Sequence, residues 1–178
     1  MKVIIPIEIN DTRLTSSSIA EPDTGESLWN AATSYTLGQQ VIRTTTHKVY
    51  ENILAGVDAG VPEITPLRWV EIGSTNRYAM FDTLRNSQSI KASPITIVIE
   101  PNYRVDSIGI LSVDADYVTI DVNYGGASVF NATKQIDTRN VFDWYSYFFS
   151  PFTKIQNYVV FNILNEFFIL YNPDNIFI

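Results

Sequence analysis

The chain has 178 residues, a length that fits one large domain or a medium domain with a small module. Hydrophobic residues make up 46% of it, enough for a buried core, whereas charged residues make up only 17%. The net charge is −7 at pH 7, and the basic residues are scattered. Both features argue against nucleic-acid binding and against an anionic membrane surface, because each of those partners selects a basic face.

The sequence also limits export and membrane insertion. It contains no cysteine, which excludes disulfides and thiolate zinc sites. The apolar run at the N-terminus is too short for a signal peptide. The longest apolar tract, residues 158–171, is interrupted by polar residues and falls short of the ~20 apolar residues that a membrane span requires. We therefore expect a soluble chain with no membrane span and no export signal.

The first 27 residues predict a strand followed by an arm. Residues 1–10 alternate loosely between apolar and polar side chains, as a short strand does. Residues 11–27 are rich in Ser, Thr, Asp, Glu, Pro and Gly, a composition typical of an extended linker. We therefore expect residues 1–27 to form an N-terminal strand and an extended arm.

Residues 28–73 predict a small three-stranded β-module. Its strands are expected at residues 39–43, 48–53 and 69–72, with a Gly- and Pro-containing loop at residues 55–65. So short a segment buries little surface, so a few large rings must supply most of its core. The rings available are those of Trp29, Tyr35, Tyr50 and Trp69. The same rings could stack on sugars, and the sequence leaves both roles open.

Residues 76–178 predict a second, larger β-domain. Strands are expected at residues 95–100, 107–113, 117–122 and 158–164, separated by turn signals such as Gly125-Gly126. This spacing is typical of an all-β sandwich of the jelly-roll or galactose-binding-like kind. Helical periodicity is weak, apart from a short turn near residues 79–84. The fold class predicted for the whole chain is therefore all-β.

The densest aromatic run lies in a segment, residues 140–152, that the sequence predicts to be irregular. Aromatic residues are enriched at the centres of protein interfaces, so this run is a candidate subunit interface, with burial in a core as the alternative. Its members are Trp144, Tyr145, Tyr147, Phe148 and Phe149.

No motif in the sequence builds a convincing reaction site. Asp23-Thr24-Gly25 matches the tripeptide of aspartic proteases, but it stands in a polar arm without a second carboxylate. His47 is the single histidine, and we expect it to be solvent-exposed rather than a catalytic base. Asp114 and Asp116, with Asp106 or Asp121, could ligate Ca²⁺, but a turn role is expected. We predict no catalytic residue, metal or cofactor, although two distant carboxylates of a glycosidase would escape detection.

The spacing in the small module resembles a known family. The stretch Tyr35-Thr36-Leu37-Gly38-Gln39-Gln40-Val41, with Trp29 before it and Tyr50 and Trp69 after it, is similar to the small chitin-binding-type carbohydrate-binding modules. That family shows an aromatic residue, then Tyr-x-x-Gly-x-x-Val, then a Tyr and a closing Trp. The match covers about a quarter of the chain, and it implies glycan binding.

A longer set of segments resembles tailed-bacteriophage virion proteins of the tail, baseplate or fibre. The similarity spans roughly residues 1–165 and includes an Asn-Arg-Tyr-Ala-Met-Phe-Asp stretch at residues 76–82. Its carriers are Leu28–Tyr35, Val41–Arg43, Tyr50-Glu51, Arg68-Trp69, Asn76–Asp82 and Asp143–Phe152. The chain departs from the family after residue 165, where further polar-alternating strands and a Gly-rich close are usual. We therefore expect a partner subunit to complete that sheet.

This second resemblance implies a structural, non-enzymatic component of a phage tail. Its expected partners are other virion tail proteins and further copies of itself, and its expected location is the virion after assembly in the host cytoplasm. Attachment to the host surface is a further role that the resemblance allows. The alternative function is that of a carbohydrate-binding module that recognises host-surface glycans.

Overall fold

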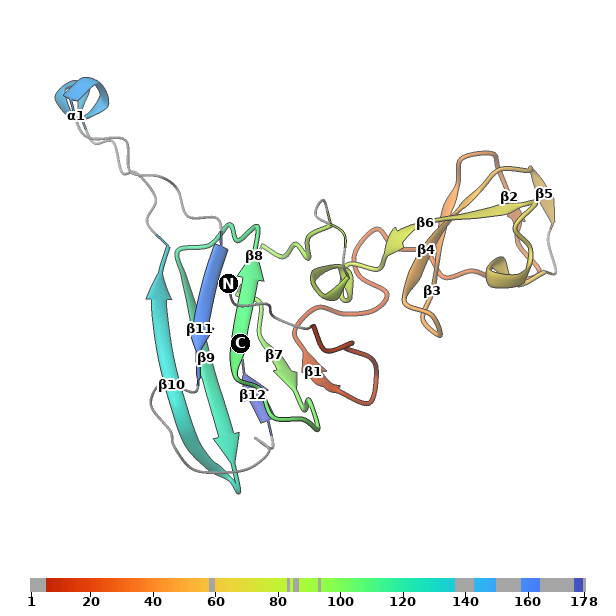
Figure 1. Ribbon diagram of the computed structural model, residues 1–178. Helices are drawn as coiled ribbons and strands as arrows, with labels where there is room; N and C mark the ends of the chain where they lie inside the picture. Colours follow the sequence, from red (N-terminus) through yellow and green to blue (C-terminus); the bar gives the residue numbers. More distant parts are fainter. Residues whose placement is uncertain are drawn as a thin grey trace. The chain divides into compact units, whose positions relative to one another are not determined.

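The protein is built mainly of β-strands, and the all-β prediction is confirmed (Figure 1). The computed structural model describes residues 6–57, 60–82, 84, 87–92, 94–136, 143–149, 158–163 and 175–177. The chain divides into two compact units. The small-sheet unit comprises residues 17–95, and the large-sheet unit comprises residues 1–16 together with 96–178.

The small-sheet unit contains a three-stranded antiparallel sheet in the order β3–β4–β6. Its strands are β3 (Gln40–Arg43), β4 (Lys48–Asn52) and β6 (Trp69–Ser74), which lie within two residues of the predicted bounds. β2 (Ser34–Tyr35) pairs with β5 (Gly56–Val57), and two short 3₁₀ helices, η1 (Pro62–Ile64) and η2 (Ala79–Phe81), complete the unit. The three strands expected in this segment therefore form one sheet.

Two residues with positive φ shape the β3–β4 hairpin. Gly38 has φ 79°, a left-handed conformation that glycine adopts without steric cost, and it turns the chain into β3. Its N–H donates to the carbonyl oxygen of Asn52 at 2.8 Å. His47 has φ 55° and ends the turn between β3 and β4. Local backbone geometry thus fixes the register at both ends of the hairpin.

The small-sheet unit is wider than the predicted module of residues 28–73. Part of the expected arm joins it, because Ile19 is 2% exposed and three acidic side chains bond to residues near Thr75. The structure therefore groups residues 17–27 and 74–95 with the small sheet. These attachments join residues about 50 positions apart, which composition alone does not reveal.

The large-sheet unit contains a five-stranded sheet in the order β1–β7–β12–β9–β10. The strands are β1 (Leu14–Ser17), β7 (Ile97–Ile99), β12 (Asn175–Phe177), β9 (Tyr117–Tyr124) and β10 (Ala127–Gln135). β12 pairs with both β7 and β9, so the chain's own C-terminal residues fill the centre of this sheet. β1, β10 and β12 lie outside the strands that the sequence predicted.

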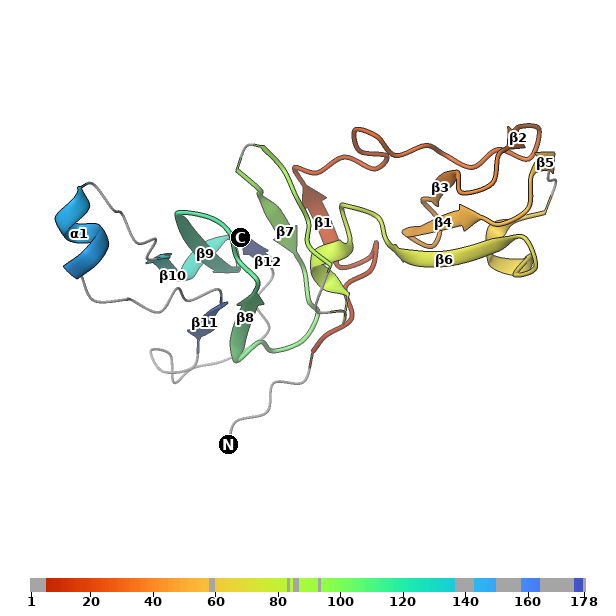
Figure 2. The same cartoon turned by 90° about the horizontal axis from the view of Figure 1, so that it is seen from above.

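A second, two-stranded sheet packs against the five-stranded one. It pairs β8 (Ser107–Leu111) with β11 (Tyr158–Asn162), and Figure 2 shows these strands in a layer of their own beside β9 and β10. Side chains alternate along β9, so every second residue faces the shared core. The buried core residues are Val118, Ile120, Val122, Ile136, Val159 and Phe161. The finer jelly-roll or galactose-binding-like topology stays a prediction.

The aromatic segment that the sequence predicted to be irregular contains a short helix. α1 runs over Trp144–Phe149, and its rings pair four residues apart along the helix. The Trp144 and Phe148 ring centroids are 6.0 Å apart, and those of Tyr145 and Phe149 are 4.9 Å apart. Such i, i+4 contacts stabilise a helical turn and are weak as a sequence signal in so short a segment.

Candidate functional site

Three of the four module aromatics lie in the core of the small-sheet unit. Tyr35, Tyr50 and Trp69 are 3%, 5% and 2% exposed and pack with Val41. The Tyr35 and Trp69 rings meet edge to face, with centroids 5.1 Å apart and planes at 77°. An edge-to-face pair adds about 0.5–1.5 kcal/mol to the burial of its rings. These three rings therefore serve mainly to fill the core.

Trp29 differs from the other three rings, because it is only partly buried against this cluster. The guanidinium carbon of Arg43 lies 5.0 Å from its ring centroid, within cation–π range. The buried indole N–H has no hydrogen-bond partner in the described part of the chain. Trp29 is thus the least buried of the four module aromatics.

An open groove of about 470 Å³ lies on the small-sheet unit. Its lining includes Tyr50 and Trp69 and the η1 residues Pro62 and Glu63. A Lys48–Glu71 ion pair, 2.9 Å between Nζ and Oε1, stands at its rim. We call it the module groove, and its lining residues are Thr46, Lys48, Tyr50, Pro62, Glu63, Pro66, Trp69 and Glu71. The lining is therefore mixed, with charged groups beside two rings that are almost fully buried.

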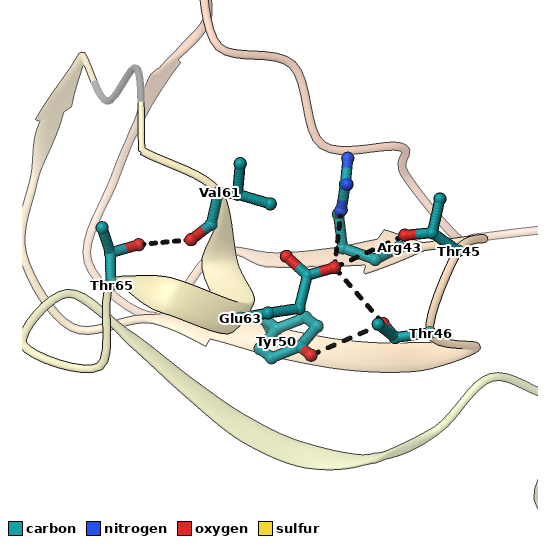
Figure 3. Close-up of polar contacts among 7 residues, drawn as sticks. All are labelled: Arg43, Thr45, Thr46, Tyr50, Val61, Glu63 and Thr65. Carbon is teal, nitrogen blue, oxygen red and sulfur yellow. Dashed lines mark hydrogen bonds and ion pairs between the residues drawn. The ribbon is translucent and has the colours of Figure 1, made fainter.

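Glu63 lines the module groove and is the centre of a set of hydrogen bonds, which Figure 3 shows. Its Oε1 accepts hydrogen bonds from Arg43 Nε at 3.0 Å and from the Thr45 and Thr46 hydroxyls at 3.5 Å each. The Thr46 and Tyr50 hydroxyl oxygens are also 3.5 Å apart. Glu63 therefore ties the β3–β4 turn to η1 across 20 residues of sequence.

The charge state of Glu63 follows from these bonds. Burial favours the neutral acid, but hydrogen bonds from its own backbone N–H and from Arg43, with the nearby Arg43 charge, lower its pKa below the usual value. Glu63 is thus ionised at neutral pH and is a poor proton donor. Its Oε2 is buried without a hydrogen-bond partner in the described chain. Nothing local in the sequence links Glu63 to Arg43, so the sequence alone does not predict this contact.

The prediction that His47 is solvent-exposed is wrong. Its side chain is 16% exposed, and Nδ1 lies 2.8 Å from Glu21 Oε2. Its ring stacks on that of Tyr78, with centroids 3.8 Å apart and planes at 20°. Glu21 Oε1 also accepts a 2.7 Å hydrogen bond from the hydroxyl of Thr75, which is fully buried. His47 therefore helps to anchor residues 17–27, and its partners are too distant in sequence to be foreseen.

The protease-like tripeptide also lies in this anchoring network. Asp23 accepts hydrogen bonds from the Asn76 side chain and from the Thr24 N–H, and these bonds lower its pKa. Glu26 Oε1 accepts the Asn76 N–H at 2.8 Å. The structure gives Asp23 amide partners here, which suits a structural carboxylate rather than the proton-sharing pair of an aspartic protease.

Asp114 and Asp116 are exposed in the turn between β8 and β9. The Asp116 carbonyl oxygen accepts a 2.9 Å hydrogen bond from the N–H of Ile136, so the turn is tied to the end of β10. Within the described ranges, no cluster of three or more His, Cys, Asp or Glu side chains is placed to hold a metal ion.

The candidate interface residues on α1 are strongly exposed. Trp144, Tyr145, Phe148 and Phe149 are 78%, 74%, 65% and 71% exposed, while the Tyr147 side chain lies outside the described residues. Positions 144, 145, 148 and 149 lie on one side of a helix of 3.6 residues per turn. The structure thus gives α1 an aromatic face.

Comparison of the chain with models of known protein families, with curated proteins and with solved structures finds no match. Where the structure describes the chain, it contains no helix long and apolar enough to cross a membrane. The function must therefore be argued from the residues and surfaces themselves.

Proposed function

We propose that this protein is a non-enzymatic structural component of a bacteriophage tail that mediates subunit assembly. Its partners are other virion tail proteins and further copies of itself. It is located in the virion after assembly in the host cytoplasm. Attachment to the host surface is a second role of the same component. The observation that carries the proposal is the aromatic face of α1, supported by the virion-protein resemblance of the sequence.

The α1 face suits an assembly contact. Four large rings stand exposed together there, with the Trp144–Phe148 and Tyr145–Phe149 pairs already in contact. Aromatic anchors of this kind supply much of the binding energy at protein interfaces once a partner covers them. Soluble monomers rarely leave such a cluster uncovered. Assembly on a partner subunit would cover these exposed rings.

The proposal is tested on particles from a host that carries the gene for this chain. Tailed phage particles are purified on a density gradient, analysed by mass spectrometry and labelled with antibodies against the chain. We expect the protein at a fixed ratio to the tail proteins and the label on the tail. Particles that are complete and infectious without it would refute the proposal.

The role of α1 is tested with the double variant Trp144→Ser, Phe148→Ser. We expect loss of incorporation into particles without a change in melting temperature, because both rings are exposed. The matched control is Leu67→Ser, a side chain 91% exposed in the small-sheet unit, which should leave incorporation unchanged. Normal incorporation of the double variant would show that α1 is not the assembly contact.

The module groove supports a second candidate function, binding of host-surface glycans. The exposed Pro66 could contact the apolar face of a sugar, and the ionised carboxylate of Glu63 could accept hydroxyl hydrogens. A glycan array with the full chain tests this, and Lys48→Ala with Glu71→Ala should weaken binding without unfolding the sheet. An array without any bound glycan would remove this function.

A further inference from the structure

The two edge strands of the five-stranded sheet differ greatly in length. One edge is β1, which has four residues, and the other is β10, which has nine. Short edge strands are a common protection against unwanted pairing, whereas a long edge strand presents a row of unpaired N–H and C=O groups. Figure 1 shows β10 as the outermost arrow beside β9. β10 is therefore the edge strand that is more open to pairing with another chain.

Among the described residues, the outer backbone groups of β10 have no partner over most of its length. Of the described strands it pairs with β9 alone, and a register shift between Ser128 and Phe130 confines the irregularity to the hairpin end. From Phe130 to Gln135 the register is unbroken and the strand contains no proline. In an antiparallel pair every second residue directs its N–H and C=O away from the neighbour. No further backbone bond joins these residues to any other described segment.

The distribution of charge favours β10 as the contact between two copies of this acidic chain. The chain carries a net charge of −7, so two copies repel one another over most of their surface. β10 contains no carboxylate, and its single charged residue is Lys134. When two copies of β10 pair antiparallel, like charges face each other only in the register that places Lys134 opposite Lys134 of the other copy. Every other register is free of repulsion along the strand.

The two faces of β10 also match between copies. Asn131, Thr133 and Gln135 are exposed on one face, where the Thr133 hydroxyl lies 2.9 Å from that of Thr119. Phe130 and Ala132 pack on the core on the other face. A two-fold axis perpendicular to the sheet places polar face beside polar face and core face beside core face. Lys134 shares the core face, where its Nζ donates to the carbonyl oxygen of Val160, so pairing extends both faces of the sheet.

We propose that β10 pairs antiparallel with β10 of a second copy, so that two five-stranded sheets join across a two-fold axis. The partner is another copy of this chain, and the contact is made by backbone hydrogen bonds along the strand edge. The biological purpose of this dimer rests on the proposed function in tail assembly, but its formation does not. A dimer in solution can exist whether or not the protein belongs to a phage tail.

The first test is sedimentation of the full chain over a range of concentrations, compared with Thr133→Pro. Proline removes a backbone donor and blocks strand addition at an edge. We expect a concentration-dependent dimer for the natural sequence and a monomer for the proline variant at the same melting temperature. A natural chain that stays monomeric throughout would overturn the inference.

The second test does not depend on the proline variant folding. Thr133→Lys with Gln135→Lys, and Thr133→Glu with Gln135→Glu, place like charges across the proposed pairing. Each double variant alone should dimerise about tenfold more weakly, and an equimolar mixture should recover heterodimers. Leu67→Lys, in the small-sheet unit, is the control and should dimerise normally. Dimers unchanged in both charge variants, or no recovery on mixing, would show that β10 is not the contact.

Discussion

Single polar side chains decide how residues 17–27 are held. Glu21 is the central one, because its two oxygens serve His47 and the fully buried Thr75 and its side chain is only 6% exposed. Removing one partner from a buried hydrogen bond costs the desolvation of the group left behind. The expected arm is thereby converted into part of a folded unit.

Glu21→Ala should therefore lower the free energy of unfolding of the small-sheet unit by about 2–4 kcal/mol. Urea unfolding followed by tryptophan fluorescence measures it, since Trp29 and Trp69 both lie in this unit. Glu51→Ala is the control, because the Glu51 side chain accepts a surface hydrogen bond from Gln40 at 3.3 Å, and its effect should stay within about 0.5 kcal/mol. Equal effects of the two changes would contradict the anchoring role.

Glu63 and Asp23 predict how stability depends on pH. Both carboxyls have a pKa lowered in the folded state, so the unfolded chain takes up their protons first as the pH falls. Their stabilisation is complete above the usual carboxyl pKa of about 4.3 and is lost progressively below it. The melting temperature should fall as the pH drops from about 5 to 3. Glu63→Gln should flatten this fall, and an unchanged profile would count against the Arg43 contact.

At the scale of elements, the three-stranded sheet depends on few buried residues. Trp69 begins β6, is 2% exposed, and contacts the ring of Tyr35 edge to face. A sheet of three short strands has little other apolar surface to bury. Core filling and sugar stacking are the two roles considered for the module aromatics. Comparing a buried ring with a partly buried one distinguishes them.

Trp69→Ala should destabilise the small-sheet unit by about 3–5 kcal/mol, because it leaves a large cavity in a small core. Trp29→Ala should cost less, since Trp29 only packs against the buried cluster. Thermal unfolding monitored by near-ultraviolet circular dichroism compares the two variants. Loss of glycan binding in a stable Trp69→Ala protein would instead support sugar stacking as the main role of that ring.

At the scale of the whole molecule, net charge keeps exposed apolar side chains apart. Large side chains such as Leu37, Ile64, Leu67 and Leu111 are 70–91% exposed, and the formal net charge is −7. Repulsion between like-charged copies opposes association through such surfaces. It vanishes near the sequence pI of about 4.6.

The protein should therefore scatter light most strongly near pH 4.6 and redissolve when the pH returns to 7. Static light scattering of the full chain between pH 3.5 and 7 measures this. Added salt at pH 7 should also promote association by screening the charges. Scattering that rises steadily toward low pH, without a maximum, would point to acid unfolding as its cause.

The sequence by itself determined the all-β class, the strands of the small sheet and the aromatic composition of its core. These features depend on alternation, turn residues and ring spacing, which are local. It missed β10 as a strand because residues such as Asn131, Ala132 and Lys134 have low β-propensity and lie at an exposed edge. Tertiary structure alone placed β12 inside the sheet, turned His47 toward Glu21 and brought Glu63 to Arg43. Each of those contacts joins residues 20 or more positions apart, and a chain's local pattern does not encode which distant groups will meet.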